Sequence, residues 1–163
     1  VVAGYLQGRC SAMTSDRSQL AAVRSGFKDP KKHIILEDVL SKEPLSPASE
    51  GSDQRLSDAM RWIIYALIAA EEKGITKSNI YQKVEIAKNN KQLKPLRRFL
   101  GIDGGLGDKI GLKNDFVISV ISATGNYGEI YERNLGKNSE VPIPRGINSL
   151  YRNGGLHISP PFN

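Results

Sequence analysis

A long run of apolar residues at helical spacing, between residues 52 and 74, constrains this fold most. Ser52 or Asp53 can cap its start, and Gly74 suits its end. A membrane-spanning helix needs about 20 apolar residues in a row, and the longest strongly apolar run is only Trp62 to Ala70. The helix must therefore bury one broad face against other elements of a folded domain. That face comprises Leu56, Ala59, Met60, Ile63, Ile64, Leu67 and Ile68.

The N-terminal forty residues indicate a different architecture. Residues 11–15 (SAMTS) are a short run of small and apolar residues, and residues 33–40 (HIILEDVL) form a β-branched apolar run. Both runs are typical of strands in a buried parallel sheet. Residues 16–26 lie between them and read as a helix, with Asp16 as its N-cap and Gly26 at its end. This order predicts a βαβ unit.

Residues 41–54 contain two prolines, a glycine and four serines, which marks a linker or an extended segment between two bodies. Helices follow over residues 76–90, from Pro95 to 100 and over residues 115–136. Gly125 and Gly128 are costly inside the last helix, so close packing against another element is expected there. The glycine-rich residues 101–112 are predicted to form a surface turn, because they lack the Gly-Lys-Ser/Thr ending of a phosphate loop.

No combination of residues indicates catalysis or metal binding. Cys10 is the only cysteine, and His33 and His157 lie in unrelated contexts. Glu71 and Glu72 are adjacent on a helix and point in different directions, so we expect them to be solvated. Glu129 and Arg133 have the spacing of a helical ion pair. The sequence thus predicts no enzyme, no metal and no cofactor.

The chain is basic, with a formal net charge of +6. Eight of its 23 basic residues lie between Lys73 and Arg98, opposed only by Glu85. This window holds one aromatic residue, Tyr81, and therefore lacks the stacking platforms of single-strand binders. A solvated helical face is favoured over a nucleic-acid or membrane-surface binder, and no nucleic-acid partner is expected.

Five segments together resemble one family closely over essentially the whole chain. It is the general L-amino-acid-binding periplasmic protein of bacterial ABC importers, within the polar amino acid solute-binding group. The most specific motifs are GRC…TSD, EEKGIT and NYGEIYERN, at residues 8–16, 71–76 and 126–134. The other matching segments are HIILEDVLSKEPLSP at residues 33–47 and LYRNGGLHISPP at residues 150–161.

The resemblance implies an α/β periplasmic-binding-protein-like fold, in which two lobes close on an L-amino acid and deliver it to a membrane permease. Residues 1–41 would be the C-terminal part of the second lobe, a βαβ remnant. Residues 42–52 would be the crossover or hinge segment, and residues 53–163 the mainly helical C-terminal part of the first lobe. The protein would be periplasmic and not an enzyme.

The resemblance also gives Asp16 a role, because an acid at this position contacts the α-ammonium group of the ligand in such proteins. A desolvated ammonium needs a charged or multiply hydrogen-bonded acceptor. Thr14 and Ser15, at the same strand end, would add hydroxyl contacts. From the residues alone, a plain helix cap is the favoured explanation of Asp16, and it is the resemblance that favours the ligand contact instead.

Family members are about twice as long, so we expect a truncated form, the C-terminal portion only. The aromatic clamp, the arginine that grips the ligand carboxylate and the cysteine partner of Cys10 would all be missing. Such a chain would be stable as a homo-oligomer or with a complementing N-terminal segment, since apolar helix faces would be uncovered. The alternative is an oligomeric remnant that no longer binds amino acids and has a structural or interaction role.

Overall fold

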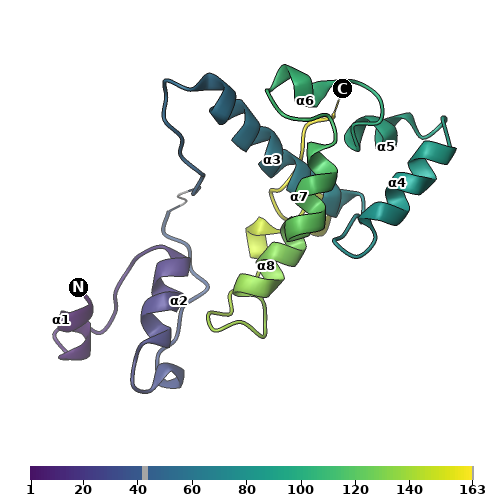
Figure 1. Ribbon diagram of the computed structural model, residues 1–163. Helices are drawn as coiled ribbons and strands as arrows, with labels where there is room; N and C mark the ends of the chain where they lie inside the picture. The colour runs from purple at the N-terminus through teal and green to yellow at the C-terminus, as the bar shows by residue number, and fades with distance from the viewer. Residues whose placement is uncertain (42–43, 163) are drawn as a thin grey trace.

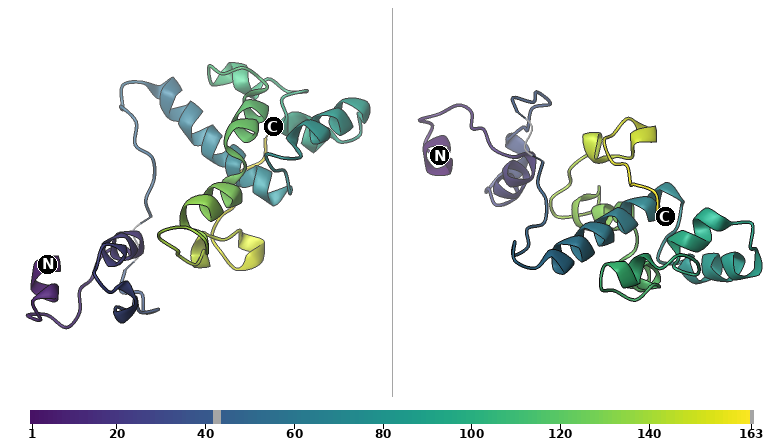
Figure 2. Two further views of the ribbon diagram at one scale, coloured as in Figure 1. Left: turned by 60° about the horizontal axis from the view of Figure 1, so that its bottom comes forward. Right: turned by 90° about the horizontal axis from the view of Figure 1, so that it is seen from above.

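Two groups of helices joined by an extended segment make up the structure, a computed structural model that describes residues 1–41 and 44–162 (Figure 1). The N-terminal body consists of α1 (Val2–Leu6), α2 (Arg17–Ser25) and a 3-10 turn at Pro30–Lys32. The two further views also show it apart from the larger C-terminal body (Figure 2). Of the predicted crossover at residues 42–52, residues 42 and 43 lie outside the described residues, and residues 44–50 have no regular secondary structure.

The C-terminal body is built around α3 (Gln54–Glu72), which begins and ends as predicted. The Asp53 side chain caps its start by accepting a hydrogen bond from the Leu56 amide at 3.0 Å. The shorter helices that follow are α4 (Ile80–Asn89), α5 (Lys94–Phe99), α6 (Leu106–Lys109), α7 (Phe116–Thr124) and α8 (Tyr127–Leu135), with 3-10 turns at Gly146–Asn148 and Tyr151–Asn153. Helices α7 and α8 pack against α3, while α4 packs against α5 and α7 (Figure 1).

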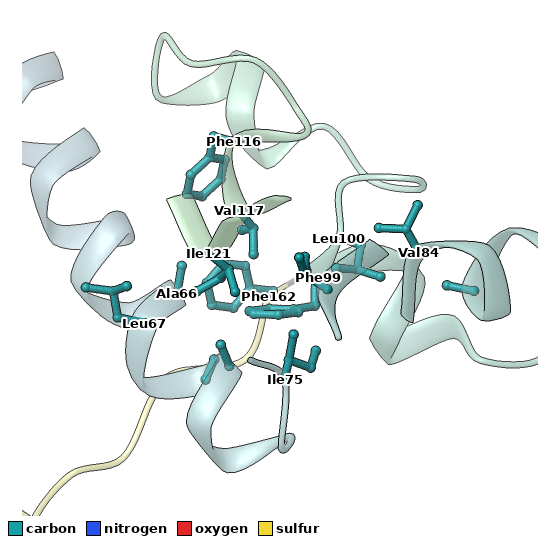
Figure 3. Close-up of a cluster of buried hydrophobic side chains, with 14 of the residues drawn as sticks. Ala66, Leu67, Ile75, Val84, Phe99, Leu100, Phe116, Val117, Ile121 and Phe162 are labelled. Atoms are coloured by element: carbon teal, nitrogen blue, oxygen red, sulfur yellow. The ribbon is translucent and has the colours of Figure 1, made fainter. Parts of the chain in front are cut away.

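The core lies between the C-terminal half of α3, the loop after it, and α4, α5 and α7 (Figure 3). Ile75, Phe99 and Ile121 are fully buried in it. Phe162, near the C-terminus, packs edge-on against Phe99 and Trp62, with ring centroids 5.0 and 5.1 Å apart. The tail therefore closes the core.

The predicted broad apolar face of α3 is buried only in part. Leu67 and Ile68 belong to the core, whereas Leu56, in the first turn, is 47% exposed. The N-terminal half of α3 runs beyond the helices that cover the other half (Figure 1).

The structure does not contain the predicted βαβ unit. The helix is present as α2, but neither residues 11–15 nor residues 33–40 form a strand. A strand needs the hydrogen bonds of a neighbouring strand. No backbone hydrogen bond joins these two described segments to each other, and the amide of His33 bonds only within its own turn, to the carbonyl of Pro30.

The helix predicted over residues 115–136 is divided in two. Gly125 has φ +80°, which ends α7, and Asn126 begins α8. The predicted close packing is present, since a Cβ on Gly128 would lie 2.9 Å from the Glu71 carboxylate carbon. The predicted Glu129–Arg133 ion pair does not form. Glu129 instead closes a capping box with Asn126, and Arg133 donates to the carbonyl of Thr124.

Asn126 links this junction to the end of α3. Its side-chain oxygen accepts from the Glu129 amide at 2.9 Å, while its side-chain nitrogen donates to the Ile75 carbonyl at 2.8 Å. Glu129 also accepts from the backbone amide of Lys77, at 3.1 Å. Asn126 is buried, at 5% exposure, so both of its bonds are shielded from water.

Arg145 joins the C-terminal tail to α3 and α8. Its guanidinium donates to both carboxylate oxygens of Glu71 and lies over the rings of Tyr127 and Tyr131, 5.6 and 5.4 Å from their centroids. The expectation that Glu71 is solvated is therefore wrong, since its side chain is largely buried in this pair. His157 packs edge-on against Tyr127 in the same cluster, with centroids 4.5 Å apart.

Replacing Asn126 tests the junction. Asn126→Ala removes the helix cap and leaves the Ile75 carbonyl buried without a partner, which should cost about 2–4 kcal/mol of unfolding free energy. Asn126→Ser keeps a capping hydroxyl and should recover part of that loss. Urea denaturation measures both variants, beside Asn134→Ala, an exposed asparagine on α8 whose loss should change stability by less than about 0.5 kcal/mol. Equal effects at both asparagines would contradict the role of Asn126.

His157 predicts a pH dependence of stability. Burial lowers the pKa of His157 below its ordinary value of 6.5, and the charge of Arg145 lowers that pKa further. The unfolded chain therefore binds the proton more readily, and stability is lost as the pH falls through 6.5 toward the folded-state pKa. Urea unfolding at a series of pH values from 7.5 to 5 should show this loss, and His157→Gln should reduce the slope. An unchanged slope in the variant would assign the effect to another group.

Candidate functional site

The three site residues named from the sequence lie together at the start of α2. Asp16 occupies the N-cap position in an extended conformation, yet its side chain makes no capping hydrogen bond. It is partly buried, and its carboxylate has no hydrogen-bond or ion-pair partner within the part of the chain that the structure describes. Asp16 therefore stands at the N-cap position, but its side chain does not cap the helix.

Ser15 and Thr14 are exposed in the extended segment before α2. The hydroxyl of Ser15 donates to the side-chain oxygen of Gln19, one turn further along the helix. Neither hydroxyl bonds to the carboxylate of Asp16. The side chains of Thr14, Ser15 and Asp16 are therefore close in the chain, but no hydrogen bond joins one of them to another.

Arg17, the next residue, forms an ion pair at the surface. Its guanidinium lies 3.0 Å from the carboxylate of Glu37, so the pair joins the start of α2 to residues 33–40. Burial raises the pKa of Tyr131 on α8, while a hydrogen bond with Asn148 and the charges of Arg145 and Arg17 work against that rise.

A cluster of aromatic and charged side chains on α8, α3 and the C-terminal tail, formed by Tyr127, Tyr131, Arg145 and Glu71, was not predicted from the sequence. Tyr127 and Tyr131 lie one turn apart on α8, with ring centroids 6.4 Å apart. Their association with Arg145 and Glu71 joins positions more than 70 residues apart. Gly128 was the available signal, because a glycine inside a polar helix indicates close approach of another group.

Two surface hollows lie elsewhere. One of about 300 Å³, beside the end of α3, is lined by Glu72, Lys73, Tyr151, Arg152, Ile158 and Ser159. Here Arg152 donates to the carbonyl of Glu72 at 2.9 Å, which satisfies the helix end. The other, of about 330 Å³, is lined by Lys28, Asp29, Pro30, Lys31 and Lys32. Neither hollow includes Thr14, Ser15 or Asp16.

The described residues contain neither a metal-binding group of side chains nor a membrane-spanning helix. Residues 1–41 and 44–162 contain no group of three or more histidine, cysteine or acidic side chains that could hold a metal ion. Within the same ranges, every helix is too short or too polar to cross a bilayer. Cys10 is exposed and unpaired.

No family model matches the chain, but individual proteins match nearly all of it. It is 44% identical over 163 residues to the general L-amino acid-binding periplasmic protein AapJ of Rhizobium johnstonii, covering 99% of this chain and 46% of that protein. It is 42% identical over 158 residues to the glutamate/glutamine/aspartate/asparagine-binding protein BztA of Rhodobacter capsulatus, covering 97% of this chain and 46% of the relative.

A solved structure matches the fold as well as the sequence. It is an ABC transporter/periplasmic binding protein from Brucella ovis with glutathione bound, 38% identical, with a TM-score of 0.87. The match covers 99% of this chain and 50% of that one. The family resemblance of the motifs is thereby confirmed, and these relatives are solute-binding proteins rather than enzymes. The chain is a homologue of the amino-acid-binding periplasmic proteins of ABC importers and spans about half the length of the curated relatives it matches.

Proposed function

We propose that this chain is part of the extracytoplasmic solute-binding component of an ABC importer, that it binds L-amino acids and that it works in the periplasm with a membrane permease. The observation that carries the proposal is the identity of 42–44% over 97–99% of the chain to two proteins named for amino-acid binding. Within this proposal, residues 1–41 belong to the second lobe, residues 42–52 are the crossover, and residues 53–163 belong to the first lobe.

Asp16 is the proposed contact for the ligand's α-ammonium group. A carboxylate that is partly buried and has no partner among the described residues is available for an incoming cation. A charge-assisted bond to an ammonium is roughly twice as strong as a neutral hydrogen bond. Ser15 and Thr14, the two residues before it, add hydroxyl oxygens as further acceptors.

The ligand class follows from what the relatives are named to bind. Glutamate, glutamine, aspartate and asparagine each carry an ammonium and a carboxylate group on an α-carbon of L configuration. Glutathione carries the same two groups on its γ-glutamyl residue. We infer that the ligand of this chain presents that pair of charges. The group that binds the carboxylate would come from the half of the fold that the relatives have beyond the match.

A homo-oligomer or a complementing N-terminal segment would complete such a site. Leu56 on α3 and several apolar side chains of residues 34–45 are exposed in the single chain. Exposed apolar surface of this kind marks an interaction site. The same exposure favours the second candidate function, an oligomeric remnant with a structural role that does not bind amino acids.

Thermal unfolding with added ligands tests the proposal. L-glutamine, L-glutamate, L-aspartate, L-asparagine and glutathione are each titrated, and a ligand at 100 times its dissociation constant should stabilise the fold by about 2.7 kcal/mol. Asp16→Ala should abolish the shift, Ser15→Ala should reduce it, and Glu140→Ala, at an exposed acid on the other body, should leave it unchanged. A shift that survives Asp16→Ala would reject the role of Asp16. The absence of any shift would favour the non-binding oligomer.

A further inference from the structure

One short stretch of the chain, residues 88–98, holds most of its net positive charge. It contains five basic residues and no acidic residue, and because the whole chain has a formal net charge of +6, the rest of the chain is close to neutral at +1. From the sequence, the larger basic window from Lys73 to Arg98 was expected to be a solvated helical face. The structure divides that window into two parts.

The first part of the window uses its lysines in contacts between helices. Lys73, at the end of α3, lies over the ring of Phe99 on α5, 5.6 Å from the ring centroid. Lys77 donates to the carbonyl of Ala123 on α7 at 2.9 Å. These two cations therefore hold the fold together and do not present a charged surface.

The second part, residues 88–98, forms a basic patch made of the end of α4, the turn after it and most of α5. Arg97 fixes the patch, because its guanidinium donates to the carbonyl of Ala87 at 2.7 Å and to both carboxylate oxygens of Asp103 at 2.6 and 2.8 Å. The other four basic side chains are exposed, and they are Lys88, Lys91, Lys94 and Arg98. The patch is thus part of a packed pair of helices.

Two acidic side chains beside the basic patch offset only part of its charge. The hydrogen bond from Arg97 lowers the pKa of Asp103, and the charges of Arg97, Arg98 and Lys91 lower it further. Glu85 lies 3.0 Å from Lys88, but both side chains are more than half exposed, so this pair is weak. Five cations and two carboxylates leave a net charge of +3 on and beside the patch.

The composition of the basic patch indicates the kind of partner it fits. Its two leucines, Leu93 and Leu96, are partly buried, and it contains no aromatic residue. Protein interfaces are centred on apolar and aromatic anchors, and proteins that bind single-stranded nucleic acids stack bases on aromatic rings. A layer of anionic phospholipid head groups needs neither, because it attracts exposed lysines and arginines by charge alone.

We propose that the basic patch binds the anionic phospholipid surface of the membrane that holds the permease. Helices α4 and α5 lie at the outer edge of the C-terminal body, away from α2 in every view (Figures 1 and 2). The patch can therefore contact a membrane while the start of α2, with the proposed ligand contacts, stays uncovered. The inference rests on the proposed function only for the periplasmic location.

Two double variants of equal net charge separate the patch from the charge of the whole chain. Lys91→Gln/Lys94→Gln removes two exposed cations that make no hydrogen bond or ion pair among the described residues. Lys28→Gln/Lys31→Gln removes two exposed lysines at the same spacing on the N-terminal body. Each lysine near an anionic surface strengthens binding about fivefold, so the first variant should bind about 25-fold more weakly and the second within about twofold of the parent.

The experiment sediments the full chain with vesicles of phosphatidylcholine alone or of an equal mixture of phosphatidylcholine and phosphatidylglycerol. We expect binding to the mixed vesicles only, and we expect it to weaken as salt is added, because salt shortens the range of electrostatic attraction. Equal binding to both kinds of vesicle, or to neither, would overturn the inference. So would a Lys91→Gln/Lys94→Gln variant that binds as the parent does, or duplex DNA that binds more tightly than the mixed vesicles.

Thermal unfolding with L-glutamine, measured on the same variants, separates this inference from the proposed function. Both double variants should keep the ligand-induced shift of the parent, since the four lysines lie outside residues 14–16. Vesicle binding without a ligand-induced shift would contradict the proposed function alone. A ligand-induced shift without vesicle binding would contradict the basic patch alone.

Discussion

The C-terminal body depends on the buried side chain of Asn126. One amide group caps α8 and fixes the loop after α3, so that the α7–α8 break and the α3–α4 turn are joined at one point. The two motifs EEKGIT and NYGEIYERN meet here, and Gly128 allows Glu71 to approach α8. These motifs are therefore explained by packing and hydrogen bonding between helices, while the proposed ligand contacts lie on the other body.

A second set of contacts fixes the C-terminal tail to the core of the C-terminal body. Arg145 pairs with Glu71 and stacks on two tyrosines, and Phe162 closes the core between Trp62 and Phe99. The N-terminal body makes no comparable use of buried groups, since Ala21 is the one buried residue of α2. The larger body therefore has a core of its own, whereas the smaller body buries almost nothing.

The sequence predicted the elements set by local rules and missed those that depend on distant partners. The bounds of α3 followed from Asp53, helical spacing and Gly74, and α2 followed from Asp16 and Gly26. The strands predicted at residues 11–15 and 33–40 were wrong, because an apolar pattern of this kind forms a strand only beside another strand, and residues 1–41 and 44–162 contain none. The Glu71–Arg145 pair could not be predicted, because no local spacing relates two residues 74 positions apart. The location of Asp16, Ser15 and Thr14 followed from the motif, but the unpartnered state of Asp16 required the structure.

The most direct test of the account is chemical-shift mapping of the isotope-labelled chain during titration with L-glutamine. If Asp16 contacts the α-ammonium group of the ligand, saturable shifts should be centred on residues 14–17, with the largest change at the Asp16 carboxyl carbon. The hollow lined by Lys73 and Arg152 should not respond. Shifts centred on that hollow, or a titration that leaves residues 14–17 unchanged, would contradict it.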